Sequence, residues 1–157
     1  FLGLAGRIRQ ETAELITVIA RAERAYRVAQ RGGVDSDLYI DATALNLHDF
    51  YSGLERIFRQ IAMTVDRSTP ASSEWHRDLL RQMCVDIPNI RPAVLTREAC
   101  DALDEFMRFR HVVRNVYAFQ LDGARIERLV RDGSSLMEQI AVELESFSSF
   151  LERAGQA

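Results

Sequence analysis

The sequence contains no lysine, and all 20 of its basic residues are arginine. Lysine is normally among the commonest residues, so every cationic contact in this chain is made by a planar guanidinium. Guanidinium groups suit bidentate recognition of phosphate or carboxylate, and they do not act as a base or form a Schiff base as lysine does. With 23 acidic residues, the formal net charge is −3, which argues against broad, non-specific coating of nucleic acid. Any nucleic-acid site is therefore expected to be local.

Cysteine, proline and glycine are also scarce. The three prolines and eight glycines leave long uninterrupted stretches, which favours an all-helical fold. Cys84 and Cys100 are too few for a disulfide framework and lie in no CxxC or Cys/His cluster. We therefore expect two reduced core thiols in a cytoplasmic protein. No run of residues is apolar enough to cross a membrane, and the charges at Arg7 and Arg9 leave no secretory hydrophobic region near the start.

The length of 157 residues, 47% of them hydrophobic, is enough to bury one core but not two. We expect a single domain over residues 1–157, built as an antiparallel all-α bundle of about five helices. The helices are predicted over residues 4–31, 36–65, 74–84, 97–119 and from Gly123 to about 153. The strongest periodic signal, typical of a helix in an antiparallel bundle, is an apolar row spaced by four and three residues. The row consists of Leu47, Tyr51, Leu54, Phe58, Ile61 and Val65.

One predicted helix carries a dense set of polar groups. At about 100° per residue, Arg110, Arg114 and Tyr117 fall within roughly 60° of one another, and His111 and Asn115 lie one step further round. The adjoining apolar face consists of Phe106, Phe109, Val113 and Val116. Two arginines four residues apart repel each other, and arginine is rarely buried without a partner. The pattern therefore requires an anion, which is either an RNA phosphate or a protein carboxylate.

These residue types suit cleavage of RNA without a metal. That reaction needs a base for the 2'-hydroxyl proton, a cation for the extra negative charge on phosphorus and an acid for the leaving oxygen. Arginine fits the middle role, and a histidine within one or two helical turns fits the others. The three histidines, at positions 48, 76 and 111, do not have the spacing of zinc ligands. We expect no metal and no cofactor.

At these residues the chain resembles the HEPN superfamily, and within it the HepT-like toxins. Their motif is an arginine, a polar residue, several intervening residues, a histidine, one residue and a tyrosine. Arg110, His111 and Tyr117 match the first, second and last positions, whereas Asn115 stands where the family has its histidine. Asparagine does not titrate near neutral pH, so His111 is the candidate to take over proton transfer. The resemblance extends over about residues 35 to 130, through the stretch 48–58 and the pair Trp75-His76.

The resemblance implies a HEPN-type helical bundle that forms a homodimer, with two motif helices facing each other across a two-fold axis. It also implies a partner, a minimal nucleotidyltransferase antitoxin encoded as the other half of a toxin-antitoxin pair. In relatives that partner adds adenylyl groups to the motif tyrosine, which corresponds to Tyr117. Phosphates added beside Arg110 and Arg114 would fill the cationic cleft and exclude RNA.

Two functions follow from the motif. In the first, the chain is a toxin and a metal-independent endoribonuclease that cleaves RNA by 2'-hydroxyl attack. Arg110 stabilises the phosphate charge, His111 transfers the proton, Arg114 and Asn115 orient the phosphate, and Tyr117 is the target of modification. The alternative is a non-catalytic HEPN interaction subunit that binds a nucleotidyltransferase, and the asparagine at the histidine position favours it.

The two arginines also have structural interpretations. In this alternative, an ion network within the bundle joins Arg110 and Arg114 to acids such as Asp104 or Glu55 on other turns and helices. Glu55 either accepts a hydrogen bond from Arg110 or is a solvated charge at the edge of its helix.

Alternatives stay open for His76 and Tyr117 as well. His76 is an accessory acid or base that reaches the cleft, or a residue that packs at a helix start. Tyr117 is a target of modification, or a buried side chain with a satisfied hydroxyl.

Overall fold

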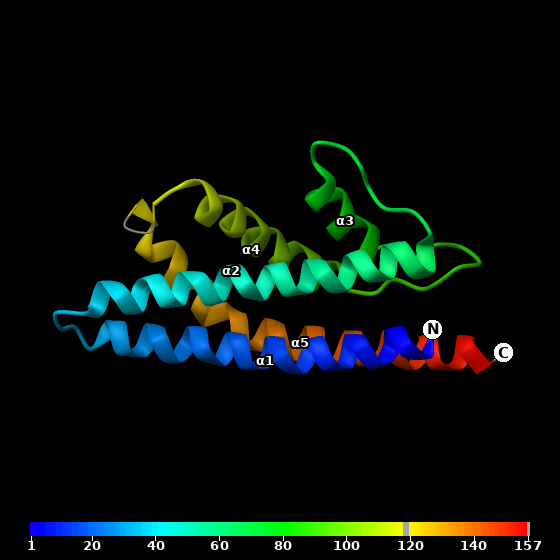
Figure 1. Cartoon of the computed structure of the whole chain (residues 1–157), viewed down its shortest axis with the longest axis horizontal. Helices are drawn as coiled ribbons and strands as arrows, with labels where there is room; N and C mark the ends of the chain where they lie inside the picture. The colour runs from blue at the N-terminus through cyan, green and yellow to red at the C-terminus, as the bar shows by residue number, and fades with distance from the viewer. Residues whose placement is uncertain (118–119, 157) are drawn as a thin grey trace.

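The computed structural model describes residues 1–117 and 120–156. Its helices are α1 (Leu2–Gln30), α2 (Ser36–Ile61), the π-helical turn η1 (Ala62–Asp66), α3 (Trp75–Met83), α4 (Arg97–Asn115) and α5 (Gly123–Gln156) (Figure 1). The described residues contain no β-strand, only an isolated bridge between Ile87 and Arg91. The prediction of an antiparallel all-α bundle of about five helices is confirmed.

The three long helices α1, α2 and α5 form the body of the molecule. α1 packs along both α2 and α5, while the shorter α3 and α4 lie on the side of α2 opposite to α1 (Figure 1). α4 also contacts α5, and α3 contacts α4. This arrangement leaves α3 and α4 next to each other on one side of α2, with α3 over its C-terminal half (Figure 1).

The apolar row predicted on α2 forms the centre of the core. All six of its members are buried, from Leu47 to Val65, and they belong to one contiguous cluster that draws on all five α-helices. α1 comes so close at Gly53 that a Cβ there would overlap Cδ2 of Leu15. Glycine at this position therefore sets the spacing between α1 and α2.

A buried ion pair fixes the chain beyond α2. Asp66 ends the π turn, and Arg67 then adopts a left-handed conformation with φ 52°. The Arg91 guanidinium donates to Asp66 through Nε at 2.6 Å and Nη2 at 2.8 Å, and both side chains are almost completely buried. Arg91 also donates to the backbone carbonyls of Val85, Pro92 and Gln82. The connector between α3 and α4, predicted to be irregular from its prolines, is thus held by a residue that sequence analysis did not single out.

The prediction of two reduced thiols is wrong, because Cys84 and Cys100 form a disulfide. Cys84 follows the last turn of α3 and Cys100 lies in the first turn of α4, which brings their Cα atoms within 6.4 Å. That separation lies in the usual range for a disulfide. Only the antiparallel packing of α3 and α4 creates this proximity, so the spacing of 16 residues did not reveal it.

α4 begins where the sequence predicts and ends earlier. Thr96 caps it by accepting a hydrogen bond from the Ala99 amide at 3.3 Å. The predicted end at 119 is not met, because the helix stops at Asn115 and Val116 is extended (φ −130°, ψ 159°). β-branched valines and an asparagine that bonds the backbone both weaken a last turn. Ala118 and Phe119, the predicted end, lie outside the described residues.

The lengths and compositions of the helices bear on membrane insertion. Within the described residues, none of the helices combines the length and the apolar character needed to cross a lipid bilayer. The cytoplasmic location itself stays a prediction.

Candidate functional site

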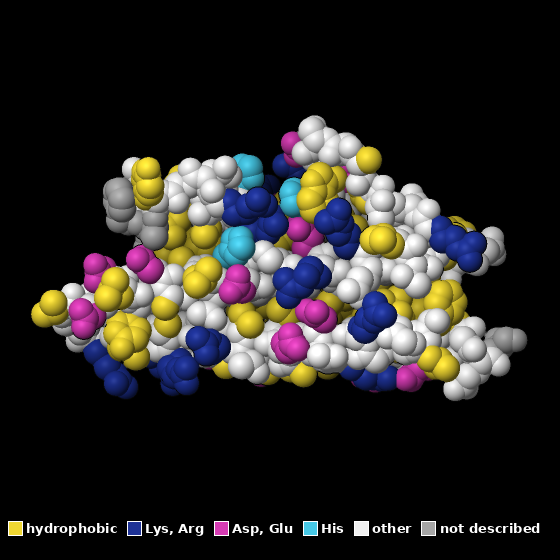
Figure 2. All heavy atoms as spheres, viewed as in Figure 1, with side chains coloured by type: hydrophobic (Ala, Val, Ile, Leu, Met, Phe, Trp, Pro, Cys, Tyr) yellow, Lys and Arg dark blue, Asp and Glu magenta, His cyan; other side chains and the backbone are white. Residues whose placement is uncertain are grey.

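A groove of about 500 Å³ lies between the start of α3 and the C-terminal half of α4. Its walls include Trp75 and His76 from α3, and Arg108, Arg110 and His111 from α4. Figure 2 shows histidine and arginine side chains gathered in this hollow, with acidic atoms visible at its base. The groove therefore brings two of the predicted motif residues, Arg110 and His111, together with the Trp75-His76 pair.

Glu55 on α2 joins the three helices beneath the groove. Its carboxylate is buried and contacts His76 Nδ1 at 2.5 Å and Arg110 Nη2 at 3.3 Å. Arg110 Nε also donates to Ser52 Oγ at 2.9 Å, one turn earlier on α2. The expected contact between Glu55 and Arg110 is present. The alternative of a solvated charge is wrong, because Glu55 is only 7% exposed.

The same face of α2 positions the start of α3. Arg59 lies one turn beyond Glu55, and its guanidinium sits 5.0 Å from the centre of the Trp75 ring, a cation–π distance. Trp75 in turn stacks on the His76 imidazole with ring centroids 3.5 Å apart. Two residues four apart on one helix thus hold two consecutive residues of the next. The pair Trp75-His76 stands out in the sequence, but its partners on α2 do not, because they are 16 and 21 residues away.

Tyr51 on α2 is a core residue close to these charges. It is only 1% exposed, and this burial raises the pKa of its hydroxyl well above the ordinary value. The negative charge of Glu55 raises this pKa further, whereas the positive charge of Arg110 lowers it. The hydroxyl therefore stays neutral, and the charges next to it are those of Glu55 and Arg110.

The two motif arginines differ in their surroundings. Arg110 is 14% exposed at its side chain, paired with Glu55 and still part of the groove wall. Arg114 is exposed and forms no ion pair with the residues that the structure describes. Asp104, the other acid considered for these arginines, pairs with Arg108 at 2.7 Å instead. The ion-network interpretation is therefore correct for Arg110 and wrong for Arg114.

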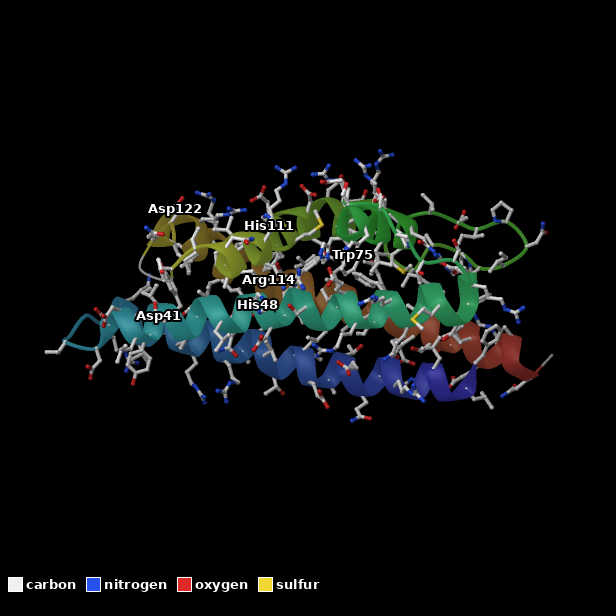
Figure 3. The ribbon with its side chains drawn as sticks, turned by 45° about the horizontal axis from the view of Figure 1, so that its top comes forward. Asp41, His48, Trp75, His111, Arg114 and Asp122 are labelled. Carbon is white, nitrogen blue, oxygen red and sulfur yellow. A yellow bond between two sulfur atoms is a disulfide. The ribbon has the colours of Figure 1, made fainter. Side chains whose placement is uncertain are left out.

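His111 is exposed and lines the groove directly beside Arg110. In Figure 3 the labelled side chains of Trp75, His111 and Arg114 lie on the side of α2 that α3 and α4 cover. His111 and His76 therefore reach one groove from two different helices. The third histidine, His48, forms its only hydrogen bond among the described residues with Asp49, at 3.2 Å. An arginine flanked by two imidazoles suits an anion such as phosphate.

The end of the motif departs from its predicted geometry. The Asn115 side-chain amide donates to the His111 carbonyl at 2.6 Å, which directs its nitrogen to its own helix. Tyr117 lies two residues beyond the end of α4 and is 73% exposed, and Val116 is 39% exposed. The predicted common face of Tyr117 with Arg110 is wrong, as is the buried-tyrosine alternative, because the helix ends before these residues.

The residues of the site also bear on metal binding. Across residues 1–117 and 120–156, no three His, Cys, Asp or Glu side chains gather closely enough to hold a metal ion. The charged side chains of the groove wall are three arginines and one glutamate, with two histidines beside them, which gives the wall an excess of positive charge.

The comparisons with known proteins agree with this architecture. A family described as HepT-like protein matches residues 42–151, well over half of the chain and the whole of the groove. The helical bundle with its site on α2, α3 and α4 is of the HEPN type. The chain belongs to the HepT-like family. No curated protein and no solved structure matches it.

Proposed function

We propose that this protein is the toxin of a toxin-antitoxin pair and that it cleaves RNA, without a metal, in the groove between α3 and α4. The observation that carries the proposal is the convergence of His76, His111 and Arg110 on one groove. Membership of the HepT-like family supports the class of function.

The proposed reaction needs only groups of this kind. The 2'-oxygen of the substrate forms a bond to phosphorus while the bond from phosphorus to the 5'-oxygen breaks. His111 accepts the 2'-hydroxyl proton, and His76 in its protonated form gives a proton to the leaving 5'-oxygen. Glu55 occupies Nδ1 of His76 and orients the ring, which leaves Nε2 for the substrate. Arg110 stabilises the charge that develops on phosphorus.

Two motif residues have supporting roles in this proposal. Arg114, exposed and without a carboxylate partner among the described contacts, binds a neighbouring phosphate. Asn115 uses its amide nitrogen for the His111 carbonyl, so it orients His111 through the backbone and presents only its oxygen to a substrate.

Cleavage in the presence of EDTA tests the catalytic part of the proposal. Arg110→Ala is expected to lower the cleavage rate by about 100-fold or more, and His111→Ala by a similar factor. The matched control is Arg24→Ala, an exposed arginine on α1 across the bundle from the groove. If the wild type cuts RNA only when divalent metal is present, or if Arg110→Ala cuts as fast as the control, the assignment is wrong.

A nucleotidyltransferase antitoxin is the proposed partner, with Tyr117 as its target. The tyrosine oxygen would attack the α-phosphorus of a nucleoside triphosphate, pyrophosphate would leave, and a base on the partner would take the proton. The 73% exposure of Tyr117 makes its hydroxyl accessible to a partner enzyme. After co-expression with the neighbouring reading frame, the intact mass is expected to rise by about 329 Da per adenylyl group, and Tyr117→Phe is expected to abolish the rise. An unchanged wild-type mass would contradict the modification.

We also propose the homodimer that the family resemblance implies, with the motif helices of two copies facing each other. Sedimentation is expected to give the mass of two chains. A monomer that cleaves RNA would contradict it.

A second candidate function is a non-catalytic subunit that binds a nucleotidyltransferase. Two observations favour it: Asn115 replaces the family histidine, and Glu55 already balances the charge of Arg110. If the wild type proves inactive, Asn115→His is expected to create RNA cleavage under this alternative. Robust cleavage by the natural sequence would exclude it.

A further inference from the structure

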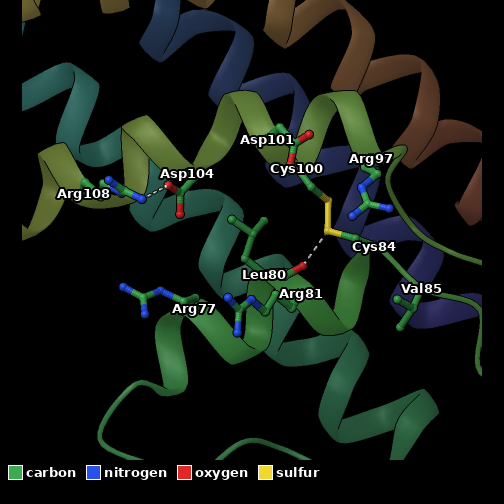
Figure 4. A pocket seen from close by; sticks show the side chains of 10 residues that line it. All are labelled: Arg77, Leu80, Arg81, Cys84, Val85, Arg97, Cys100, Asp101, Asp104 and Arg108. Atoms are coloured by element: carbon green, nitrogen blue, oxygen red, sulfur yellow. Dashed lines mark hydrogen bonds and ion pairs between the residues drawn. A yellow bond between two sulfur atoms is a disulfide. The ribbon is translucent and has the colours of Figure 1, made fainter.

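A second, larger cavity of about 800 Å³ runs between α3 and α4 beside the groove. Figure 4 shows its walls, in which arginines from both helices face a common space. The charged lining comprises Arg77, Arg81, Arg97 and Arg108 together with Asp101 and Asp104. We call this cavity the arginine channel. It has an excess of two positive charges, in a chain whose formal net charge is −3.

The arginines line the channel from both walls, two on α3 and two on α4. Arg77 and Arg81 are four residues apart and lie on one face of α3. On α4, Arg97 and Arg108 lie eleven residues apart, with the two aspartates at intermediate helical spacings. The disulfide joins the walls at the Arg97 end. α3 and α4 thus form the walls of a positively charged corridor and are covalently joined at one end.

The arginine channel continues into the groove, because Arg77 and Arg108 line both. From Arg97 to Arg110 the distance along the α4 axis is about 20 Å at 1.5 Å per residue. A strand with stacked bases rises 3.4 Å per nucleotide, so this length matches about six nucleotides. One strand can therefore occupy the channel and the groove together.

The arginines of the channel are not all neutralised. Arg108 pairs with Asp104 at 2.7 Å, and Arg77 pairs with Glu74 at 3.2 Å. Arg81 and Arg97 are exposed, and neither forms an ion pair with any described residue. Two guanidinium groups, one on each wall, are thus available for a polyanion.

We propose that the arginine channel binds the phosphodiester backbone of the RNA strand whose scissile phosphate occupies the groove. This inference rests on the proposed function and names the part of the protein that holds the substrate outside the cleavage site. Guanidinium groups on both walls favour a phosphate backbone, and the direct opening into the groove favours the substrate strand over a separate ligand. Binding by backbone phosphates would depend strongly on salt and little on base sequence.

The test measures binding without cleavage. The probe is a fluorescein-labelled, 2'-O-methylated RNA strand of about 12 nucleotides, which has no free 2'-hydroxyl to attack. Its dissociation constant is measured by anisotropy over a series of salt concentrations for the wild type and for Arg81→Ala/Arg97→Ala. Losing two phosphate contacts is expected to reduce the slope of log K against log salt by about 1.4. The matched control is Arg24→Ala/Arg27→Ala on α1, which is expected to keep the wild-type slope.

Two results would overturn the inference. One is a wild type that does not bind the probe, and the other is a double variant with the same slope and affinity as the control while its circular dichroism shows an intact fold. The proposed cleavage is judged separately, by whether wild-type protein cuts unmodified RNA in EDTA. Binding with the predicted slope change but no cleavage would support the arginine channel and contradict the proposed function.

Discussion

Glu55 is the residue on which the site geometry depends most. Its carboxylate contacts both His76 on α3 and Arg110 on α4, and no other carboxylate in the described residues contacts both side chains. Its substitution therefore affects the contacts of both side chains at once. A neutral side chain of the same shape separates the effect of charge from that of packing.

We predict that Glu55→Gln lowers the free energy of unfolding by about 1.5 to 3 kcal/mol, the range for hydrogen bonds to charged groups. The measurement is urea denaturation, with Glu127→Gln on the exposed face of α5 as the control. Cleavage of RNA is expected to fall as well, because His76 loses the group that fixes its ring. Equal stability of the two variants would show that the carboxylate does not hold the helices together.

Arg91 presents a more completely buried case. Arg91→Met leaves the Asp66 carboxylate buried without its bidentate partner. The expected loss of stability is about 3 to 5 kcal/mol, as for other broken buried ion pairs, and thermal or urea unfolding measures it. A loss below about 1 kcal/mol would mean that water or another donor replaces the guanidinium.

At the scale of elements, α3 is a short helix whose position relies on its ends. Its first turn is held by α2 through Glu55 and Arg59, and its last turn is joined to α4 by the disulfide. Both walls of the groove and of the arginine channel therefore depend on these attachments. The nine residues of α3 itself supply few intrahelical bonds.

We predict that Cys84→Ser/Cys100→Ser lowers the free energy of unfolding by about 3 kcal/mol, the chain-entropy value for a loop of this length. RNA cleavage is expected to fall with it, because His76 moves with α3. A thiol assay on unreduced, unfolded wild type is expected to find no free thiol. Two free thiols there, with equal stability of the variant, would contradict the disulfide.

The pairing of α1 with α5 gives the bundle a dependence on pH. Arg9 donates to Glu145 and Glu152, and these hydrogen bonds hold the pKa of both carboxyl groups below the ordinary value of 4.5. Because the folded pKa is lowered, the stabilisation is present above the ordinary carboxyl pKa. It is lost as the pH falls through the folded values.

Arg9→Gln is therefore expected to lower the unfolding temperature at neutral pH and to approach the wild type in acid. The effect is small, since the groups are exposed and screened. Thermal scans from about pH 7 to about pH 3 measure it. A difference that stays constant over this range would show that the ion pairs contribute nothing to the pH dependence.

The elements that sequence patterns predicted well are those governed by local periodicity. The apolar row of α2 is buried as predicted, and Thr96 caps α4. The C-terminal end of α4 was mispredicted because the spacing rules assume that the helix continues. There, the valines and the Asn115 amide decide the end of the helix.

At the scale of the whole molecule, the site is assembled from three helices. Arg110 and His111 were predicted because they are neighbours on one helix. The contacts of Glu55 with His76, 21 residues away, and of Cys84 with Cys100 depend on tertiary packing. No spacing rule for a single helix gives such contacts, so sequence analysis identified Glu55 and His76 as candidates without pairing them. The packing of α3 against α4 also forms the arginine channel, and no sequence motif marks the residues that line it.

The most direct test of the central claim is an analysis of the RNA ends that the purified protein produces in EDTA. If the groove catalyses 2'-hydroxyl attack, the products carry 2',3'-cyclic phosphate and 5'-hydroxyl ends, and a substrate with a 2'-deoxy sugar at the cut position stays intact. Arg110→Ala is expected to yield none of these ends, while Arg24→Ala yields them as the wild type does. Products with 5'-phosphate ends, or cutting of the 2'-deoxy substrate, would contradict the account.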